Sequence, residues 1–223
     1  MTTTLTKFDA NTGEASGYLA RPGKEKAGVI VIQEWWGIVP HVEDLVRRFA
    51  AQGFVAMAPD LYHGKKTLDA AEAEHLMTGL DWGRAAQEIA GAVRYLREKE
   101  GCTKVGIVGF CMGGALTVIG ASVADVDAYV AFYGFPPDGA CDLSKVKAPG
   151  RIFFGDREGF FDVGKAKAFA ESQTAKGIPT EFHVYPDADH AFFNDTRPEV
   201  HSPVASNDAW KRTLEHFGAH LRG

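Results

Sequence analysis

One cysteine lies where a strand-to-helix turn would present it to a substrate. Residues 108–114 read VGFCMGG, in which an apolar strand runs into the pattern Gly-x-Cys-x-Gly and then into a stretch that favours a helix. This pattern is typical of a nucleophile elbow, with Cys111 in the place of the usual serine. Side chains beside the nucleophile would collide in so sharp a turn, which explains Gly109 and Gly113. The alternative interpretation is a structural cysteine in a glycine-rich turn.

An elbow of this kind carries its own oxyanion donor. The backbone N–H of Met112 would face the developing oxyanion, and the helix dipole would favour the thiolate of Cys111, which is the attacking species. A second donor is expected from the loop after the first main strand, VIVIQEWWGIVPH, where the N–H of Trp35 is the natural candidate. The sequence therefore predicts an oxyanion hole formed by these two amides.

A histidine and an acid follow the elbow in the order in which a fold with such an elbow supplies a catalytic triad. After the strand TEFHVY comes PDADHAFFND, so His190 is expected to be the general base. After the strand RIFF comes GDREGFFD, which offers three carboxylates for the acid. Glu158 is favoured because Gly155 ends the strand and a side chain three residues further on can turn toward the imidazole. Asp156 is the alternative, and Asp162 is interpreted as the N-cap of the next helix.

Polar and aromatic residues near these loops complete the predicted site. Glu34 is unusual at the end of a buried strand, because a carboxylate there needs a partner. It is either one half of a structural ion pair or a group that interacts with the thiol. We expect Trp35 and Trp36 to form the wall of a pocket. The candidate substrate-binding residues are Trp36, Tyr133, Phe192 and Arg197.

Other chemistry-bearing residues form no recognisable site. The remaining seven histidines lack metal-ligand spacing such as H-E-x-x-H, and each is interpreted as a surface or structural residue. Cys102 and Cys141 are expected in surface turns, without partners. No G-x-G-x-x-G or P-loop occurs, so neither a metal nor a nucleotide cofactor is expected.

The elements that must position the site alternate between short apolar runs and stretches of helical period. This pattern indicates an α/β fold with a mostly parallel twisted sheet and helices on both faces. A polar turn and a short helix within residues 62–82 could form a small cap on an otherwise single domain, 1–223. The main strands are expected at 28–33, 54–58, 104–109, 128–133, 151–155 and 180–185, with an antiparallel edge at 4–8 and 16–20. The helices are expected at 41–52, 82–99, 112–122, 163–176 and 206–221.

Composition excludes several classes of function. The net charge of −5 arises from 24 basic and 29 acidic residues without a run of one sign, so binding to nucleic acid or an anionic membrane is not expected. Residues 105–124 form an uncharged run of membrane-spanning length, but glycines interrupt it where a strand would turn into a helix. Three scattered cysteines and no signal peptide favour a reducing, cytoplasmic location. The oligomeric state is left open as monomer or homodimer.

The motifs QEWWG, APDLY, VGFCMGG, GDRE and DHAFFND together resemble the dienelactone hydrolase family of α/β-hydrolases, in order and spacing along nearly the whole chain. The resemblance implies a cysteine nucleophile at Cys111 and a histidine base at His190. It implies an acid at Glu158, where the family usually has aspartate, which keeps Asp156 as an alternative. It also implies that Glu34 holds the resting thiol until substrate releases it.

One departure from the family concerns the substrate. The family grips the carboxylate of dienelactone with arginines from the cap and from just after the His-x-Phe motif. The segment 68–80 contains no arginine, and Phe193 and Asn194 follow HAF, although Arg197 could substitute. The sequence therefore predicts a hydrolase of a small lactone or carboxylic ester that acts through a thioester acyl-enzyme. The alternatives are a thioesterase or another small-ester hydrolase, or a ligand-binding or redox-sensing protein that uses Cys111.

Overall fold

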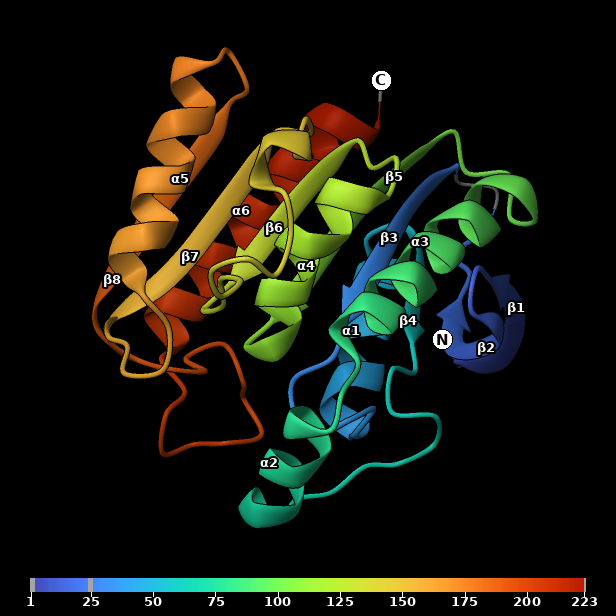
Figure 1. The fold of residues 1–223 in the computed structure, drawn as a ribbon, viewed down its shortest axis with the longest axis horizontal. Helices are drawn as coiled ribbons and strands as arrows, with labels where there is room; N and C mark the ends of the chain where they lie inside the picture. The colour runs from blue at the N-terminus through green and yellow to red at the C-terminus, as the bar shows by residue number, and fades with distance from the viewer. Residues whose placement is uncertain (1–2, 24–25, 223) are drawn as a thin grey trace.

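The computed structural model describes residues 3–23 and 26–222, and its centre is one eight-stranded sheet (Figure 1). The strand order is β1-β2-β4-β3-β5-β6-β7-β8, and every pairing from β4 to β8 is parallel. The antiparallel pairings β1 with β2 and β2 with β4 form the other edge, as predicted. The strands are β1 Thr4–Ala10, β2 Gly13–Ala20, β3 Ala27–Ile32, β4 Val55–Pro59, β5 Lys104–Phe110, β6 Ala128–Phe132, β7 Gly150–Arg157 and β8 Thr180–Asp189.

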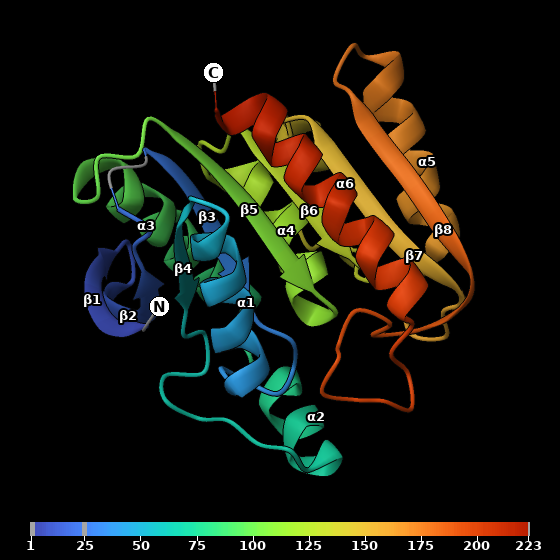
Figure 2. The same cartoon turned by 180° about the vertical axis from the view of Figure 1, so that it is seen from behind.

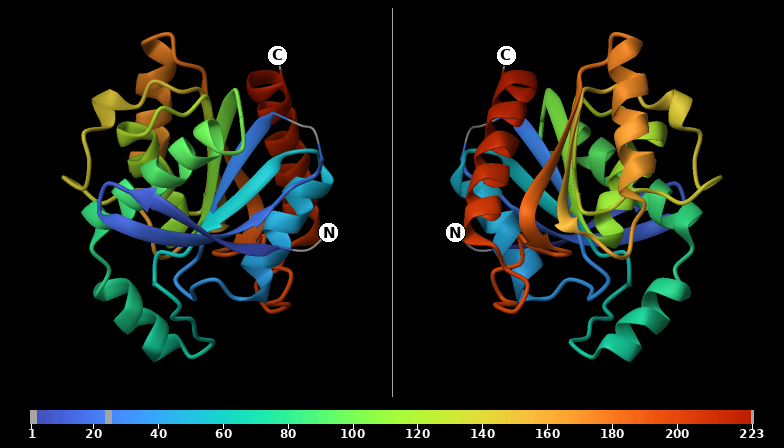
Figure 3. Two further views of the ribbon diagram at one scale, coloured as in Figure 1. Left: turned by 90° about the vertical axis from the view of Figure 1, so that its right-hand side faces the viewer. Right: turned by 90° about the vertical axis from the view of Figure 1, so that its left-hand side faces the viewer.

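Helices cover both faces of this sheet. Figure 2 shows α1 and α6 on one face, and Figure 1 shows α3, α4 and α5 on the other. The side views of Figure 3 show the sheet lying between these two layers. The helices are α1 Pro40–Ala51, α2 Ala70–Thr78, α3 Trp82–Glu98, α4 Met112–Val123, α5 Val163–Ala175 and α6 Pro203–Leu221, with a short 3₁₀ turn at Leu143–Lys145. This arrangement confirms the predicted α/β-hydrolase fold.

Burial explains why the central strands read as continuous apolar runs. All residues of β3, β4 and β6 are buried, as expected for parallel strands covered on both faces. The uncharged run at 105–124 consists of most of β5, the Cys111 turn and α4 with the residue after it. Its residues are buried except Cys111 and Ala124, which are half-buried, and Val123, which is exposed. Among the described residues, we found no helix with the length and apolarity needed to cross a bilayer.

Three expectations about this framework needed adjustment. Strand β8 continues four residues beyond its predicted end, to Asp189, across a register shift against β7 between Gly155 and Arg157. Helix α6 begins at Pro203, where the Ser202 side chain accepts the N–H of Ala205. The third adjustment concerns Cys102.

The prediction that Cys102 lies in a surface turn was wrong. Its side chain is only 3% exposed and packs in the core between β3 and α3, where a Cβ on Gly28 would lie 3.1 Å from its sulfur. A cysteine thiol behaves as a small apolar group, so burial at the end of a turn is favourable. Cys141, by contrast, is half-buried in an irregular segment.

The segment between β4 and α3 leaves the sheet and carries α2. Figure 1 shows α2 set apart from the other helices, beyond one end of the sheet. The chain enters this segment through a turn in which Asp60 accepts the N–H groups of Tyr62 and Gly64. This is the position at which the sequence predicted a short helix, and it places α2 over the loops that carry the candidate site.

Candidate active site

Cys111 lies in a strained turn between β5 and α4. Its backbone angles are φ 57° and ψ −120°, a conformation that side chains other than glycine rarely adopt. A Cβ on Gly109 would lie 2.0 Å from the carbonyl oxygen of Gly113, and a Cβ on Gly113 would lie 2.4 Å from that of Gln33. These contacts account for both glycines and give the segment the geometry of a nucleophile elbow.

The thiol of Cys111 faces the two amides predicted for the oxyanion hole. The backbone N–H groups of Met112 and Trp35 both favour the thiolate and lower the pKa of this thiol. Burial, and after it the negative charge of Glu34, raises the pKa of the thiol well above its ordinary value of 9.0, although the two amides act in the opposite direction. The raised pKa favours the neutral thiol over the thiolate in the resting protein.

The structure pairs His190 with Glu158. The distance from His190 Nδ1 to Glu158 Oε2 is 2.7 Å, and the Glu158 side chain is only 1% exposed. The other carboxylate oxygen, Oε1, accepts the backbone N–H groups of Phe160 and Phe161 at 2.8 and 3.2 Å. This network fixes the orientation of the imidazole and leaves its Nε2 as the nitrogen available to a thiol.

The alternative acid, Asp156, does not share this arrangement. It is an exposed residue of β7, ahead of the turn that brings Glu158 back toward the imidazole. Asp162 is the N-cap of α5, because its Oδ1 accepts the N–H of Lys165 at 3.0 Å. Of the three carboxylates that the sequence offered, only Glu158 contacts His190 in the structure.

Glu34 is buried beside the thiol, and it has no ion-pair partner within residues 3–23 and 26–222, so the structure does not support the interpretation as half of an ion pair. Glu34 is only 2% exposed, and its carboxylate accepts two hydrogen bonds from neutral groups. Tyr133 Oη donates to Oε1 at 3.3 Å, and Asn194 Nδ2 donates to Oε2 at 2.8 Å. Neutral donors do not cancel the negative charge of a carboxylate, and this charge contributes to the raised pKa of the Cys111 thiol.

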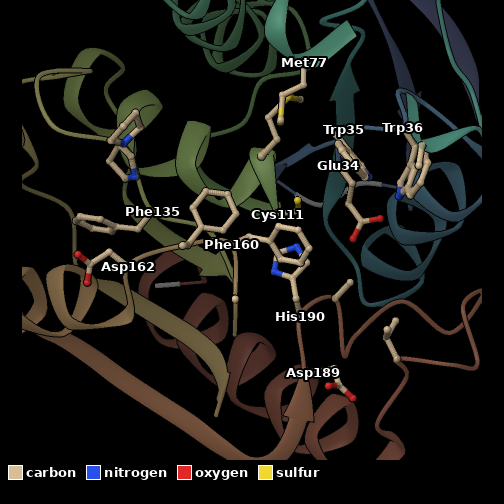
Figure 4. Close-up of a pocket in the computed structure, with 18 of the residues that line it drawn as sticks. Glu34, Trp35, Trp36, Met77, Cys111, Phe135, Phe160, Asp162, Asp189 and His190 are labelled. Atoms are coloured by element: carbon tan, nitrogen blue, oxygen red, sulfur yellow. The ribbon is translucent and has the colours of Figure 1, made fainter. Parts of the chain in front are cut away.

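Cys111 and His190 line one cavity of about 890 Å³. Figure 4 shows the sulfur near its centre, with Glu34, Trp35 and Trp36 on one side and Phe135 and Phe160 on the other. Met77 of α2 reaches the cavity from above in this view, so the predicted cap segment contributes to the wall. A volume of this size accommodates a drug-sized molecule.

The predicted substrate-binding residues divide into two pairs. Trp36 and Arg197 line the cavity, with the guanidinium carbon of Arg197 5.6 Å from the centre of the Trp36 ring. Tyr133 and Phe192 do not line it, which corrects the prediction for both. Each is fully buried, and their rings pack together at a centroid distance of 5.4 Å. Tyr133 contacts the site indirectly, because its hydroxyl donates a hydrogen bond to Glu34, which does line the cavity.

Two residues near the site were missed by the sequence interpretation. Asn194 was named only as a departure from the family motif, yet it is the partner that the buried Glu34 required. The signal was available, because a buried carboxylate predicts a nearby donor, but nothing identified which donor. Phe160 was not considered, although its ring lies 4.7 Å from that of His190.

The remaining histidines and acids that the structure describes form no second centre of this kind. His63 and His75 line a smaller cavity between α2 and α3, where His63 Nε2 lies 3.0 Å from the buried Glu88. His41 and His216 are buried, and burial lowers the pKa of each, that of His216 to about 4. Within residues 3–23 and 26–222, we found no group of three or more His, Cys, Asp or Glu able to hold a metal ion.

Comparison with known proteins identifies the group to which this fold and site belong. The model of the dienelactone hydrolase family matches residues 15–221. The chain is 33% identical to "Protein usf" of Aquifex pyrophilus over 97% of this chain and 98% of that one. It is 29% identical to a "Putative carboxymethylenebutenolidase" of Aquifex aeolicus over 98% and 99% of the two chains.

A solved structure agrees with these sequence comparisons. The crystal structure of a "Putative Dienelactone Hydrolase" from Klebsiella pneumoniae superposes with a TM-score of 0.84 at 25% identity, covering 98% of both chains. The fold and the family match define the chain as a carboxylic-ester hydrolase of the α/β-hydrolase class. Within that class, the chain belongs to the dienelactone hydrolase family.

Proposed function

We propose that this protein opens a small lactone or carboxylic ester with Cys111 as the nucleophile and His190 as its base. The observation that carries the proposal is the 2.7 Å pairing of His190 Nδ1 with the buried Glu158, on the cavity that also receives the Cys111 sulfur. Glu158 fixes the tautomer in which Nε2 accepts the thiol proton, and it stabilises the imidazolium that forms.

The reaction proceeds in two stages. The thiolate attacks the ester carbonyl, and the N–H groups of Trp35 and Met112 stabilise the oxyanion of the tetrahedral intermediate. The C–O bond breaks, His190 returns its proton to the leaving alkoxide, and a thioester to Cys111 remains. Water activated by the same imidazole then hydrolyses the thioester and regenerates the thiol.

Glu34 has a role in the resting state under this proposal. Its charge, which meets only neutral hydrogen-bond donors in the part of the chain that the structure describes, disfavours the thiolate and keeps Cys111 protonated when no substrate is present. The neutral thiol is a poor nucleophile and is also slow to oxidise, so the free enzyme is protected. This assignment agrees with the role that the family resemblance implied for Glu34.

The test compares hydrolysis of p-nitrophenyl acetate and of a panel of lactones by the parent and by Cys111→Ala. We expect the variant to lose nearly all turnover while its circular dichroism spectrum and unfolding midpoint stay close to the parental ones. Equal rates in the two proteins would end the proposal. Cys141→Ala serves as the matched control, because this half-buried cysteine does not line the cavity.

A further inference from the structure

The wall of the cavity around Cys111 is mostly apolar and includes several aromatic side chains. Trp35, Phe135, Phe160 and Phe161 line it, and Met77 adds a flexible thioether from α2. Figure 4 shows Met77 above the sulfur, Trp35 on one side of it, and Phe160 and, further away, Phe135 on the other side. Aromatic and thioether surfaces bind apolar groups by displacing water, and they provide little for an anionic group.

The cations of the cavity are already paired. Of the described residues that line it, three carry permanent positive charge, and each has a carboxylate partner. Arg157 pairs with Asp187 at 2.7 Å, Lys165 with Asp138 at 2.6 Å and Arg197 with Glu199 at 2.9 Å. The side chains of these cations are 55%, 49% and 35% exposed, so solvent weakens the field of each at the cavity.

Negative charge, in contrast, lies close to the sulfur. Glu34 lines the cavity beside Cys111 and has only neutral hydrogen-bond donors among the described residues. A substrate carboxylate near the thiol would experience this charge without a buried cation to offset it. The electrostatics of the site therefore disfavour an anionic substrate.

The ring of Phe160 is an exposed apolar surface at the cavity. Its side chain is 76% exposed even though it lines the cavity and lies 4.7 Å from the His190 ring. Its backbone N–H is held by Glu158, so the loop that presents the ring is anchored to the proposed triad. An apolar group of a bound substrate would cover this ring and remove its exposed area from water.

We infer, on the premise of the proposed function, that the site disfavours anionic substrates and selects esters or lactones that carry an apolar group the size of an aromatic ring, with Phe160 as a specificity-determining residue. The inference joins three observations: an apolar wall with several aromatic side chains, a carboxylate at the thiol with only neutral donors among the described residues, and an exposed ring beside the imidazole. It distinguishes this chain from members of its family that grip a substrate carboxylate.

The first arm of the test varies charge at constant shape. Methyl 4-acetoxybenzoate and 4-acetoxybenzoate are compared as substrates, with each kcat/KM divided by the hydroxide-catalysed rate of the same ester to correct for the leaving group. We expect the neutral ester to be preferred about tenfold, because the carboxylate faces Glu34. An equal or greater corrected rate for the carboxylate would overturn the inference.

The second arm removes the exposed ring. In Phe160→Ala, we expect the ratio of kcat/KM for phenyl acetate to that for ethyl acetate to fall about tenfold, mainly through KM. The control is Leu68→Ala, which removes an exposed apolar side chain that does not line the cavity and should leave the ratio unchanged. An unchanged ratio in Phe160→Ala would contradict a role in specificity.

Two readouts separate the possible failures. The pH profile of kcat/KM should be the same in Phe160→Ala as in the parent, because the backbone N–H that binds Glu158 is retained. A shifted profile would mean that Phe160 acts through His190 and not on the substrate, which would overturn the specificity role. If Cys111→Ala keeps full activity, the proposed function itself fails. If the parent prefers the carboxylate ester and Cys111→Ala loses activity toward both esters, the proposed function stands and only the inference about substrate charge is overturned.

Discussion

The amide of Asn194 donates a 2.8 Å hydrogen bond to the carboxylate of Glu34, although 160 residues separate the two in the chain. Glu34 follows β3, in the middle of the sheet order, and Asn194 follows β8, at its edge, so the bond joins loops whose strands are separated by β5, β6 and β7. Both residues are 2% exposed. The pairing satisfies a buried charge without neutralising it.

Removal of this donor should destabilise the fold. Asn194→Ala leaves one oxygen of a buried carboxylate without its partner, and we expect a loss of about 2–3 kcal/mol in the free energy of unfolding, measured in urea. Thr196→Ala is the matched control, because Thr196 Oγ1 bonds to the other end of the same amide and should cost less than about 1 kcal/mol. Similar losses in the two variants would contradict the importance of the Glu34 contact.

The identity of the triad acid can be tested with two neutral substitutions. Glu158→Gln keeps the shape but presents an NH₂ group that can favour the wrong tautomer of His190, so kcat/KM should fall about 10³-fold or more. Asp156→Asn alters an exposed carboxylate away from the imidazole and should stay within about twofold of the parent. A greater loss in Asp156→Asn than in Glu158→Gln would reverse the assignment.

The pH dependence of thiol reactivity tests the role of Glu34. Burial and the Glu34 charge both raise the pKa of Cys111, so the thiolate fraction near pH 8 is far below that of an ordinary cysteine. Removing the negative charge lowers the pKa, so Glu34→Gln should react with iodoacetamide about threefold faster or more at pH 8. The signal of Cys111 is obtained by subtracting the rate of Cys111→Ala.

The control for that measurement removes a carboxylate elsewhere. Glu43→Gln changes the charge on α1, where the Glu43 carboxylate pairs with Arg47, and should leave the reactivity of Cys111 unchanged. Slower alkylation in Glu34→Gln than in the parent would show that Glu34 promotes the thiolate. That outcome would contradict its proposed function in the resting enzyme.

Breaking the ion pair of Arg197 should raise kcat/KM for an anionic substrate, which the site otherwise disfavours. In Glu199→Gln, the guanidinium of Arg197 loses its 2.9 Å ion pair and becomes available to the cavity that it lines. We expect kcat/KM for 4-acetoxybenzoate to rise about two- to fivefold, with little change for its methyl ester. Glu181→Gln, which breaks an ion pair to Arg151 outside the cavity, should change neither rate. Equal gains for both esters would rule out a charge effect.

The sequence predicted the fold and the centre of the site because local rules determine them. Apolar runs of strand length identified the six main strands, and Gly109 is explained by a contact with the Gly113 carbonyl that any sharp strand-to-helix turn would make. The order of nucleophile, acid and histidine along the chain then located Glu158 and His190. These inferences need only neighbours in sequence or successive strand ends.

Other features depend on packing between distant segments, and these were mispredicted or missed. Phe192 precedes Phe193 directly, and only the tertiary fold determines that its ring packs against Tyr133 and away from the cavity. Cys102 lies in the turn after α3, and its side chain packs into the core through contacts with other elements. The Glu34 partner, Asn194, lies in a loop whose position depends on β8 and α6. None of these contacts leaves a periodic signal in one sequence.

The central claim is that the Cys111 sulfur attacks the substrate and carries its acyl group. The most direct test is rapid acid quenching of the enzyme during turnover of p-nitrophenyl acetate, followed by peptide mass spectrometry. The account predicts an acetyl group on the peptide that contains Cys111, and no such adduct in Cys111→Ala. Full turnover with the acetyl group absent from Cys111, or present instead on another side chain, would contradict it.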